Sequence, residues 1–456
     1  SKNEWKELVH KSEAAAWDPQ IFWDKEKDEL YEYYGSSNLY PIYGVKLNRK
    51  TFQPEGGVVP LIALNDEEHG WERFGENNDN TFMQPFMEGA FMTKHKNTYY
   101  LQYGGPGTEF SGYGDGVYTS KNPLGPFVYQ SHNPFSYKPG GFARGAGHGA
   151  TFQDANSTFW HVSTIVIGTK NNFERRLGIW PAGIDEEGVL YSNTAYGDYP
   201  TFLPSQNKDH LKGSFSGWML LNYNKPVSVS STLGGFQPNY AVNEDIKTYW
   251  SAKTGNKGEW LISDLGERST IRAIQINYAD QDVTLMGKPE NTVGHKYLIT
   301  VSDNLKEWKV IVDKSKNSKD VPHEYVELEK PVIGRYLKIE NIQMPTGKFA
   351  LSGFRVFGKG NGEAPAPVKN FVPLRVAPKT KGERRNVWFK WEQEPLADGY
   401  VIYFGKSPNQ LYGSVMVYGK NEYYLNALDR SDAYYFQIES FNSNGISPRT
   451  PVIRVE

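Results

Sequence analysis

Three hairpin-like units recur in the first half of the chain, and they constrain its fold more than any other feature. Each has an aromatic-rich run, a turn of charged or small polar residues, and a second aromatic-rich run; the units span residues 20–33, 89–103 and 149–162. Strand-forming residues on both sides of a short polar turn are typical of a β-hairpin. Because the units return at intervals of roughly 60 residues without a helical period, they predict a β-propeller with about four strands in each blade.

The bulk composition excludes several classes of function. A length of 456 residues favours about three domains. The net charge of −2 gives no basic excess for binding nucleic acid or an anionic membrane surface, and the absence of a long apolar run argues against a membrane span. Cysteine is absent, so we expect no disulfide and no Cys-ligated metal, which fits a bacterial protein in any compartment.

The strand pattern changes along the sequence and predicts three all-β domains. Residues 1–222 carry the propeller-like units, and alternating strands over 223–360 predict a jelly-roll β-sandwich. A Gly- and Pro-rich stretch at 359–367 reads as a linker. The remaining residues, 361–456, have the size of one immunoglobulin-like sandwich, with Tyr434 as its expected tyrosine corner.

Two acidic residues each stand just ahead of an aromatic strand. Asp18 precedes the first unit and Glu88 precedes the second. Glycoside hydrolysis typically needs two carboxyl groups that face one glycosidic bond, so this placement suggests a sugar-cleaving site built on repeated β-units. The alternatives are a solvated strand-edge residue for Glu88 and an Asx-Pro turn for Asp18.

The first region resembles glycoside hydrolase family 43 in three segments, which are Trp-Asp-Pro-Gln-Ile-Phe (17–22), Met-Glu-Gly-Ala-Phe-Met (87–92) and Gly-Ala-Gly-His-Gly (145–149). Members of that family are five-bladed propellers that cleave with inversion. The resemblance implies Glu88 as the general acid, Asp18 as the modulator of its pKa, and His148 as a residue near the propeller axis, beside an ion or water. An acid must be neutral near pH 7, so we expect a raised pKa for Glu88, with repulsion from Asp18 as the cause. A hydrogen-bonded core histidine is the alternative for His148.

The catalytic base of that family has no match in this sequence. It is an aspartate in an Asp-Pro motif on the first blade, whereas only residues 1–16 precede Asp18 here. The stretch 5–9 resembles the tail of an earlier blade. We therefore expect an N-terminal polypeptide segment that completes the propeller and supplies the base; an unusual fold is the alternative.

Other side chains suit sugar binding. Trp71 could form a stacking wall for a sugar, although packing within its loop is the favoured interpretation. One of Arg175 and Arg176 could direct its guanidinium onto sugar hydroxyls, and the other is expected to be a surface charge. Turn chemistry is an adequate explanation of Asp115, which lies between glycines.

The second region resembles a discoidin-type, galactose-binding-like module in its early acidic loop, 243–250, and its closing strand, 351–358. Asn243, Asp245 and Thr248 offer oxygen ligands that suit Ca²⁺, and members of this family often hold a structural calcium in that loop. An ordinary polar loop is the alternative. The third region resembles fibronectin type III. No cofactor is expected for the chemical step.

The expected function is an inverting, exo-acting glycoside hydrolase of the α-L-arabinofuranosidase, β-xylosidase, or galactosidase or galactofuranosidase type. Its expected partner is an oligo- or polysaccharide, and no nucleic-acid partner is expected. The protein is expected to be secreted, periplasmic or on the bacterial cell surface. Two alternatives stay open. One is a non-catalytic carbohydrate-binding protein with a degenerate propeller, which the unmatched base favours, and the other is an adhesion module built from the two sandwiches.

Overall fold

The structure, a computed structural model, describes residues 17–169, 174–202, 215–284, 293–375 and 384–456. Within these ranges the chain is all-β, and its helical elements are two short 3₁₀ turns, η1 (Gly70–Glu72) and η2 (Pro238–Ala241). In the same ranges, no helix has the length and apolarity that a membrane span needs. The predicted fold class is confirmed, while the stretch 5–9 lies outside the described residues.

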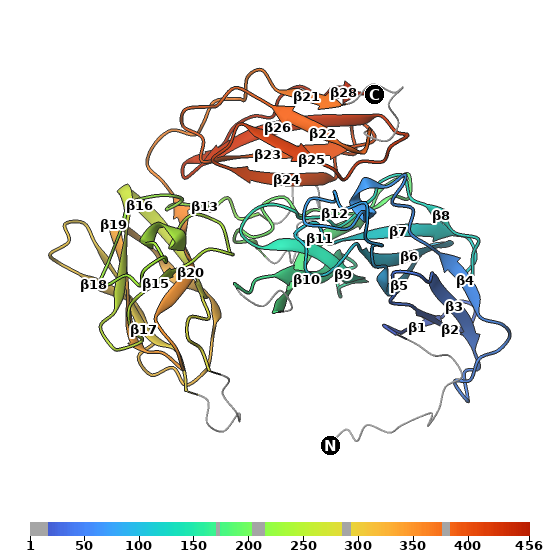
Figure 1. The fold of residues 1–456 in the computed structure, drawn as a ribbon, viewed down its shortest axis with the longest axis horizontal. Helices are drawn as coiled ribbons and strands as arrows, with labels where there is room; N and C mark the ends of the chain where they lie inside the picture. The colour runs from blue at the N-terminus through green and yellow to red at the C-terminus, as the bar shows by residue number, and fades with distance from the viewer. Residues whose placement is uncertain (1–16, 170–173, 203–214, 285–292, 376–383) are drawn as a thin grey trace.

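Three four-stranded antiparallel sheets form a fan of blades in the first half of the chain (Figure 1). In each sheet the strands follow one another in chain order. The first blade contains β1 (Gln20–Asp24), β2 (Glu29–Tyr34), β3 (Ile42–Leu47) and β4 (Val59–Ile62). The second contains β5 (Glu88–His95), β6 (Thr98–Gly105), β7 (Gly114–Ser120) and β8 (Val128–Tyr129). The third contains β9 (Arg144–Gln153), β10 (Phe159–Val166), β11 (Arg175–Ile184) and β12 (Leu190–Ser192).

Local chemistry explains why the three predicted hairpins form. The pairs β1–β2, β5–β6 and β9–β10 each close over a polar turn. In the first turn the Asp24 carboxylate accepts hydrogen bonds from the backbone N–H groups of Glu26 and Lys27, a side-chain pattern that stabilises turns. Lys96 and Ser157 take positive φ angles in the other two turns. These turns reverse the chain, and the flanking aromatic runs pair as strands.

The first strands of the three blades are neighbours. β1 contacts β5, and β5 contacts β9. Since the first strands of adjacent blades contact one another, residues at the starts of these strands are brought together even though they lie far apart in the sequence. This arrangement positions the candidate site.

The second domain is built on one extensively hydrogen-bonded sheet of eight strands. Its two longest strands, which pair with each other, change register along their length. The strands are β13 (Met219–Leu220), β14 (Val227–Val229), β15 (Trp250–Ser251), β16 (Trp260–Tyr278), β17 (Lys296–Ser302), β18 (Lys309–Asp313), β19 (His323–Gln343) and β20 (Ala350–Lys359). Because β13 pairs with β20, the sheet takes in residues before the predicted boundary at 223.

The third domain has two facing antiparallel sheets. One contains β21 (Val372–Arg375), β22 (Val387–Lys390) and β25 (Glu422–Leu425), and the other contains β23 (Gly399–Gly405), β24 (Gly413–Tyr418), β26 (Tyr434–Asn442), β27 (Gly445–Ile446) and β28 (Ile453–Val455). The Tyr434 hydroxyl accepts a hydrogen bond from the backbone N–H of Asp429 at 2.9 Å, which is the geometry of a tyrosine corner. The resemblance to fibronectin type III stays a prediction.

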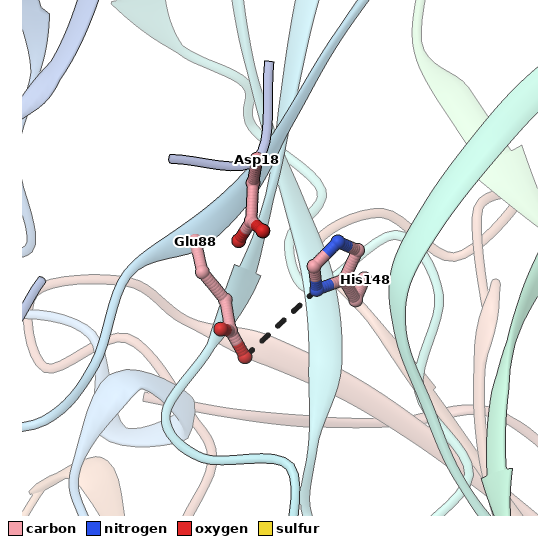
Figure 2. Close-up of side chains that lie close together, drawn as sticks. All are labelled: Asp18, Glu88 and His148. Atoms are coloured by element: carbon pink, nitrogen blue, oxygen red, sulfur yellow. Dashed lines mark ion pairs between the residues drawn. The ribbon is translucent and has the colours of Figure 1, made fainter. Parts of the chain in front are cut away.

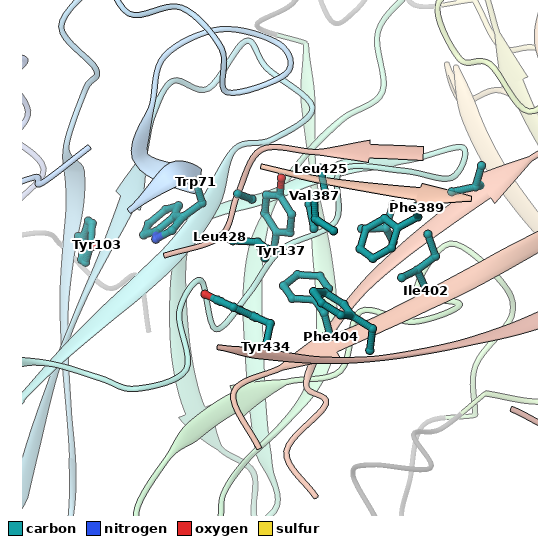
Figure 3. Packing of buried hydrophobic residues seen from close by; sticks show 14 of the residues in the cluster. Trp71, Tyr103, Tyr137, Val387, Phe389, Ile402, Phe404, Leu425, Leu428 and Tyr434 are labelled. Carbon is teal, nitrogen blue, oxygen red and sulfur yellow. The ribbon is translucent and has the colours of Figure 1, made fainter. Parts of the chain in front are cut away.

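The third domain packs directly on the propeller, against the loop that leads into η1 and against β12 of the third blade (Figures 1 and 3). Its apolar core is continuous with that of the propeller, and Trp71 and Tyr103 lie on the propeller side of the shared cluster (Figure 3). The His69 imidazole lies 2.7 Å from the Asp429 carboxylate. A Cβ atom on Gly70 would stand 2.3 Å from the carbonyl oxygen of Asn426, so glycine is required for this close approach. The third domain is a packing partner of the propeller.

A buried charge network joins the propeller to the second domain. The Arg355 guanidinium donates two hydrogen bonds of 2.8 Å to the Glu244 carboxylate and a third, of 2.6 Å, to the carbonyl oxygen of Asp198. Lys138 lies 3.3 Å from the Asp198 carboxylate on the propeller side. All four side chains are almost fully excluded from solvent, so each charge depends on its partners.

Candidate active site

The structure brings Asp18, Glu88 and His148 together at the starts of the three blades (Figure 2). Asp18 lies just before β1, Glu88 is the first residue of β5, and His148 lies within β9. One oxygen of each carboxyl group and a nitrogen of the imidazole all lie within 4.8 Å of one another. Two carboxyl groups and an imidazole therefore meet at one point.

Glu88 is held by three polar neighbours. The Tyr113 hydroxyl donates a 2.5 Å hydrogen bond to Oε1, and the Ser36 hydroxyl donates one of 3.3 Å to Oε2. Nδ1 of His148 lies 3.9 Å from Oε1. The Glu88 side chain is 16% exposed, so it is oriented by the protein and still reachable from solvent.

His148 approaches Glu88 with an unusual backbone conformation and with glycines around it. His148 adopts a φ of +52° and lies in a strand, not in the glycine-flanked loop that the sequence suggested. A Cβ atom on Gly89 would lie 2.8 Å from Cδ2 of the His148 ring, and one on Gly104 would lie 2.9 Å from the His148 backbone nitrogen. The glycines on β5 and β6 thus make the space into which His148 fits, and strain of this kind is common at functional sites.

Asp18 also has an unusual backbone, with a φ of +50°. Its carboxylate accepts a 3.4 Å hydrogen bond from the backbone N–H of Gly89, next to Glu88. An inverting hydrolase needs about 6.5–9.5 Å between its acid and its base, because a water molecule must fit there. The oxygens of Asp18 and Glu88 stand closer than this, so the geometry suits Asp18 as a neighbour that influences Glu88 and not as the base.

The pKa of Glu88 departs from the sequence-based expectation. Burial raises it, but interactions with His148 and with the Tyr113 and Ser36 hydroxyls outweigh burial, so the pKa lies below that of an ordinary glutamate. The interaction with Glu88 in turn raises the pKa of His148, against the effect of burial. The two groups therefore favour each other's charged form, with the imidazole as the partner of the carboxylate.

The Glu88–His148 pair predicts a defined pH dependence. The lowered pKa of Glu88 adds stability that is present above about pH 4.3 and is lost as the pH falls through the folded-state pKa. The raised pKa of His148 adds stability that is present below about pH 6.5 and is lost as the pH rises through its folded-state pKa. We expect His148→Gln to destabilise the protein most between these two values, measured as the difference in Tm across a pH series.

The same variant should shift the pH–rate profile. Without the imidazolium, the pKa of Glu88 rises, and the alkaline limb of kcat/KM moves to higher pH. Asp18→Asn removes a negative neighbour and should move that limb to lower pH. An alkaline limb that stays in place in both variants would contradict the assignment of Glu88 as the group that must be protonated.

Asp18, Glu88 and His148 are also the group in the described part of the chain whose geometry could hold a metal ion. Carboxylate oxygens and an imidazole nitrogen are ligands that several divalent cations accept. A cation bound to Glu88 would compete with the proton that a general acid must carry.

The predicted calcium loop is held together by its own hydrogen bonds. The Asn243 amide donates to Oγ1 of Thr248 at 2.8 Å, and that hydroxyl donates to the Asp245 carbonyl oxygen at 3.1 Å. Oδ1 of Asp245 accepts a 3.2 Å hydrogen bond from the Lys247 N–H and lies 3.8 Å from Arg144. Calcium takes six to eight oxygen ligands, and the loop gathers several oxygens at these three residues. Calcium binding here stays a prediction.

A buried polar chain that the sequence did not predict lies beneath His148. The His161 imidazole lies 2.8 Å from the Asp115 carboxylate and 2.9 Å from the Thr151 hydroxyl, which donates to Gln102 at 2.7 Å. A Cβ atom on Gly149 would lie 2.4 Å from His161. Asp115 therefore lies in strand β7 and takes part in this buried polar chain. It does not lie in a glycine-rich turn. Because the partners are far apart in the sequence, no local pattern marks them.

The other three predicted binding residues lie in three different environments. Arg175 hydrogen-bonds the Thr108 hydroxyl at 2.5 Å, and its charge acts on the pKa of Tyr113, so it lies beside the site. Arg176 is exposed and pairs with Glu174 at 3.3 Å. Trp71 is fully buried and donates to the Tyr129 hydroxyl at 2.9 Å. Trp71 is therefore a core residue, and it offers no open face for a sugar.

Comparison with protein families identifies the first two domains. Residues 1–190 match the family model of glycosyl hydrolases family 43. This region is a family 43 glycosyl hydrolase domain. Residues 226–353 match the F5/8 type C domain, which is the discoidin-like module. The protein is thus a glycosidase that acts on O-glycosyl bonds and carries a discoidin-like jelly roll behind its hydrolase domain.

Solved structures resemble the chain at a low level. A glycoside hydrolase is 18% identical, with 76% of this chain and 72% of that chain covered and a TM-score of 0.41. A thermostable family-43 glycoside hydrolase is 21% identical, with 38% of this chain and 56% of that chain covered and a TM-score of 0.31. The family 32 carbohydrate-binding module of C. perfringens NanJ, solved with galactose, is 18% identical over 31% of this chain and 98% of its own, with a TM-score of 0.26. No curated protein matches the chain.

Proposed function

We propose that the hydrolase domain releases single sugar units from a polysaccharide side chain with inversion, and that Glu88 is the general acid. The observation that carries this proposal is the meeting of Glu88, Asp18 and His148 at the starts of three blades. The family match of residues 1–190 supports it. Two carboxyl groups and a water molecule suffice for the reaction, so the proposed reaction needs no cofactor.

In the proposed reaction the Glu88 proton passes to the glycosidic oxygen while the bond from that oxygen to the anomeric carbon breaks. A water molecule adds to the opposite face of that carbon and gives its proton to a base. Glu88 must first be protonated. A bound sugar excludes water from the site, and desolvation raises the pKa of a carboxyl group. The nearby Asp18 charge acts in the same direction.

The base is proposed to come from polypeptide outside the described residues. The outer face of the first blade exposes large apolar side chains, with Trp17, Ile21 and Trp23 at 76%, 50% and 46% exposure. Propeller blades normally pack face to face, and an uncovered apolar sheet face is unfavourable. We infer that further polypeptide covers this face and brings an aspartate to about 6.5–9.5 Å from Glu88.

The proposed substrates are polysaccharides with terminal L-arabinofuranose, D-xylose or a galactose-type sugar. Such polymers do not cross membranes, so a secreted, periplasmic or surface location fits the proposal. The discoidin-like module would serve to hold the hydrolase near its polymer.

Inversion can be tested on the full-length protein with aryl glycosides of the three sugar types. Proton NMR of the first product formed should show the anomer opposite to that of the substrate, before mutarotation mixes the two. Release of the retained anomer would contradict the inverting assignment. No turnover of any glycoside would favour the alternative of a carbohydrate-binding protein with a degenerate propeller.

A further inference from the structure

A cavity of about 450 Å³ lies where the three domains meet. Its walls come from loops of the blades, from the acidic loop of the second domain, and from β24 and β25 of the third domain. This volume is within the range of about 300–1,000 Å³ that is usual for small-molecule sites. We call it the junction cavity, and it is distinct from the group around Glu88.

The polar lining of the junction cavity is only partly used by the protein. Arg144 donates one hydrogen bond, at 3.1 Å, to the Gly141 carbonyl oxygen, and it lies 3.8 Å from Asp245. Oδ1 of Asn426 has no hydrogen-bond partner among the described residues, although Asn426 is only 4% exposed. A buried acceptor without a partner is costly.

Aromatic and charged residues at the rim indicate the kind of ligand. The lining includes Tyr423 and Tyr424, and Tyr424 is 53% exposed. The charged lining consists of Arg144 and Lys420 against three acidic residues, one of which, Glu244, is already paired with Arg355. The remaining charges balance, so the cavity suits an uncharged ligand. Aromatic faces attract the weakly positive C–H groups of a sugar ring, and planar side chains such as Arg and Asn hydrogen-bond its hydroxyls.

We propose that the junction cavity binds a neutral oligosaccharide segment, as an accessory site for the polymer on which the hydrolase domain acts. The choice of polymer rests on the proposed function. Two segments connect this cavity to the Glu88 group. Ser111, which donates to Glu76 at the rim, is two residues from Tyr113, and Arg144 begins the strand that carries His148. A polymer held in the cavity is therefore kept on the molecule while its side chains reach the hydrolase site.

The test uses the full-length protein with arabinoxylan, arabinogalactan and matching neutral oligosaccharides as probes. Binding is measured by affinity gel electrophoresis and titration calorimetry, and turnover is measured separately on a small aryl glycoside. Tyr424→Ala and Arg144→Gln should each weaken binding of the preferred polymer by roughly 3–10-fold. Both should raise KM for that polymer and leave kcat/KM for the aryl glycoside within about twofold of wild type. Tyr325→Ala, which removes a half-exposed tyrosine of the second domain away from this cavity, is the matched control and should bind as wild type does.

The outcomes separate this inference from the proposed function. If the wild type binds polymer, the two variants lose binding and no glycoside is hydrolysed, the accessory site stands and the proposed function fails. If the wild type hydrolyses glycosides but both variants bind polymer as tightly as it does, the accessory site is overturned and the proposed function stands. A wild type that binds none of the polymers overturns the accessory site whatever its activity.

Discussion

Glu88→Gln should lower kcat on polysaccharide by about 10²–10⁴-fold, which is the usual contribution of a general acid. Glutamine keeps the size of the side chain and can still contact Tyr113 and Ser36, but it carries no transferable proton. The leaving group would then depart as an unprotonated alkoxide, which is a poor leaving group in water. The effect should fall mainly on kcat, because protonation occurs in the transition state. Product release from arabinoxylan or arabinogalactan, followed by reducing-sugar assay, measures it.

The control for this prediction is Glu186→Gln, a change of the same type at an exposed glutamate in a turn. It should leave kcat within twofold of wild type. Matching thermal unfolding curves for both variants and the wild type would show that lost activity is not lost structure. Activity of Glu88→Gln within a few-fold of wild type would show that another group donates the proton.

Arg355→Met should cost about 3–5 kcal/mol of stability, the usual penalty for removing one partner of a buried ion pair. Methionine fills part of the space but leaves Glu244 without its two hydrogen bonds. Burial already raises the pKa of Glu244, and Arg355 is the main opposing influence. In the variant the Glu244 carboxyl would take up a proton or expose itself by opening the interface. Urea unfolding at pH 7 measures the loss, which should shrink at low pH.

Arg335→Met is the matched control. Arg335 makes the same two-bond contact with Asp264, at 2.8 Å, but on the surface, where removal of an ion pair costs about 0–1 kcal/mol. The double variant Arg355→Met with Glu244→Gln should recover part of the stability, because no unpaired carboxylate remains. Equal losses for the two single arginine variants would contradict the view that burial makes the Arg355 network essential.

Local chemistry was enough to predict much of the fold. The hairpins of all three blades follow from polar turns between aromatic runs, and the structure has each of them. The tyrosine corner at Tyr434 could also be predicted from the sequence, because its hydrogen-bond partner is only five residues away. The change of domain near residue 222 was visible as a change from clustered aromatics to alternating strands.

Long-range partners could not be predicted from the residues alone. The convergence of Asp18, Glu88 and His148 was expected from a family resemblance, whereas the His161–Asp115 contact joins residues 46 apart in the sequence with no shared pattern. The direction of Trp71 depends on the short η1 turn and on the third domain against which it packs. The pKa of Glu88 lies in the opposite direction from the sequence-based prediction, because His148 and two hydroxyl groups contact the carboxylate and outweigh its burial.

The dependence of rate on the leaving group tests the role of Glu88 most directly. A series of aryl glycosides with the same sugar and phenols of increasing pKa should be hydrolysed by the wild-type protein at rates that vary little, because the acid assists the poor leaving groups most. For Glu88→Gln the rate should fall steeply as the phenol pKa rises, while the best leaving groups approach the wild-type rate. Parallel slopes for the two proteins would contradict proton donation by Glu88.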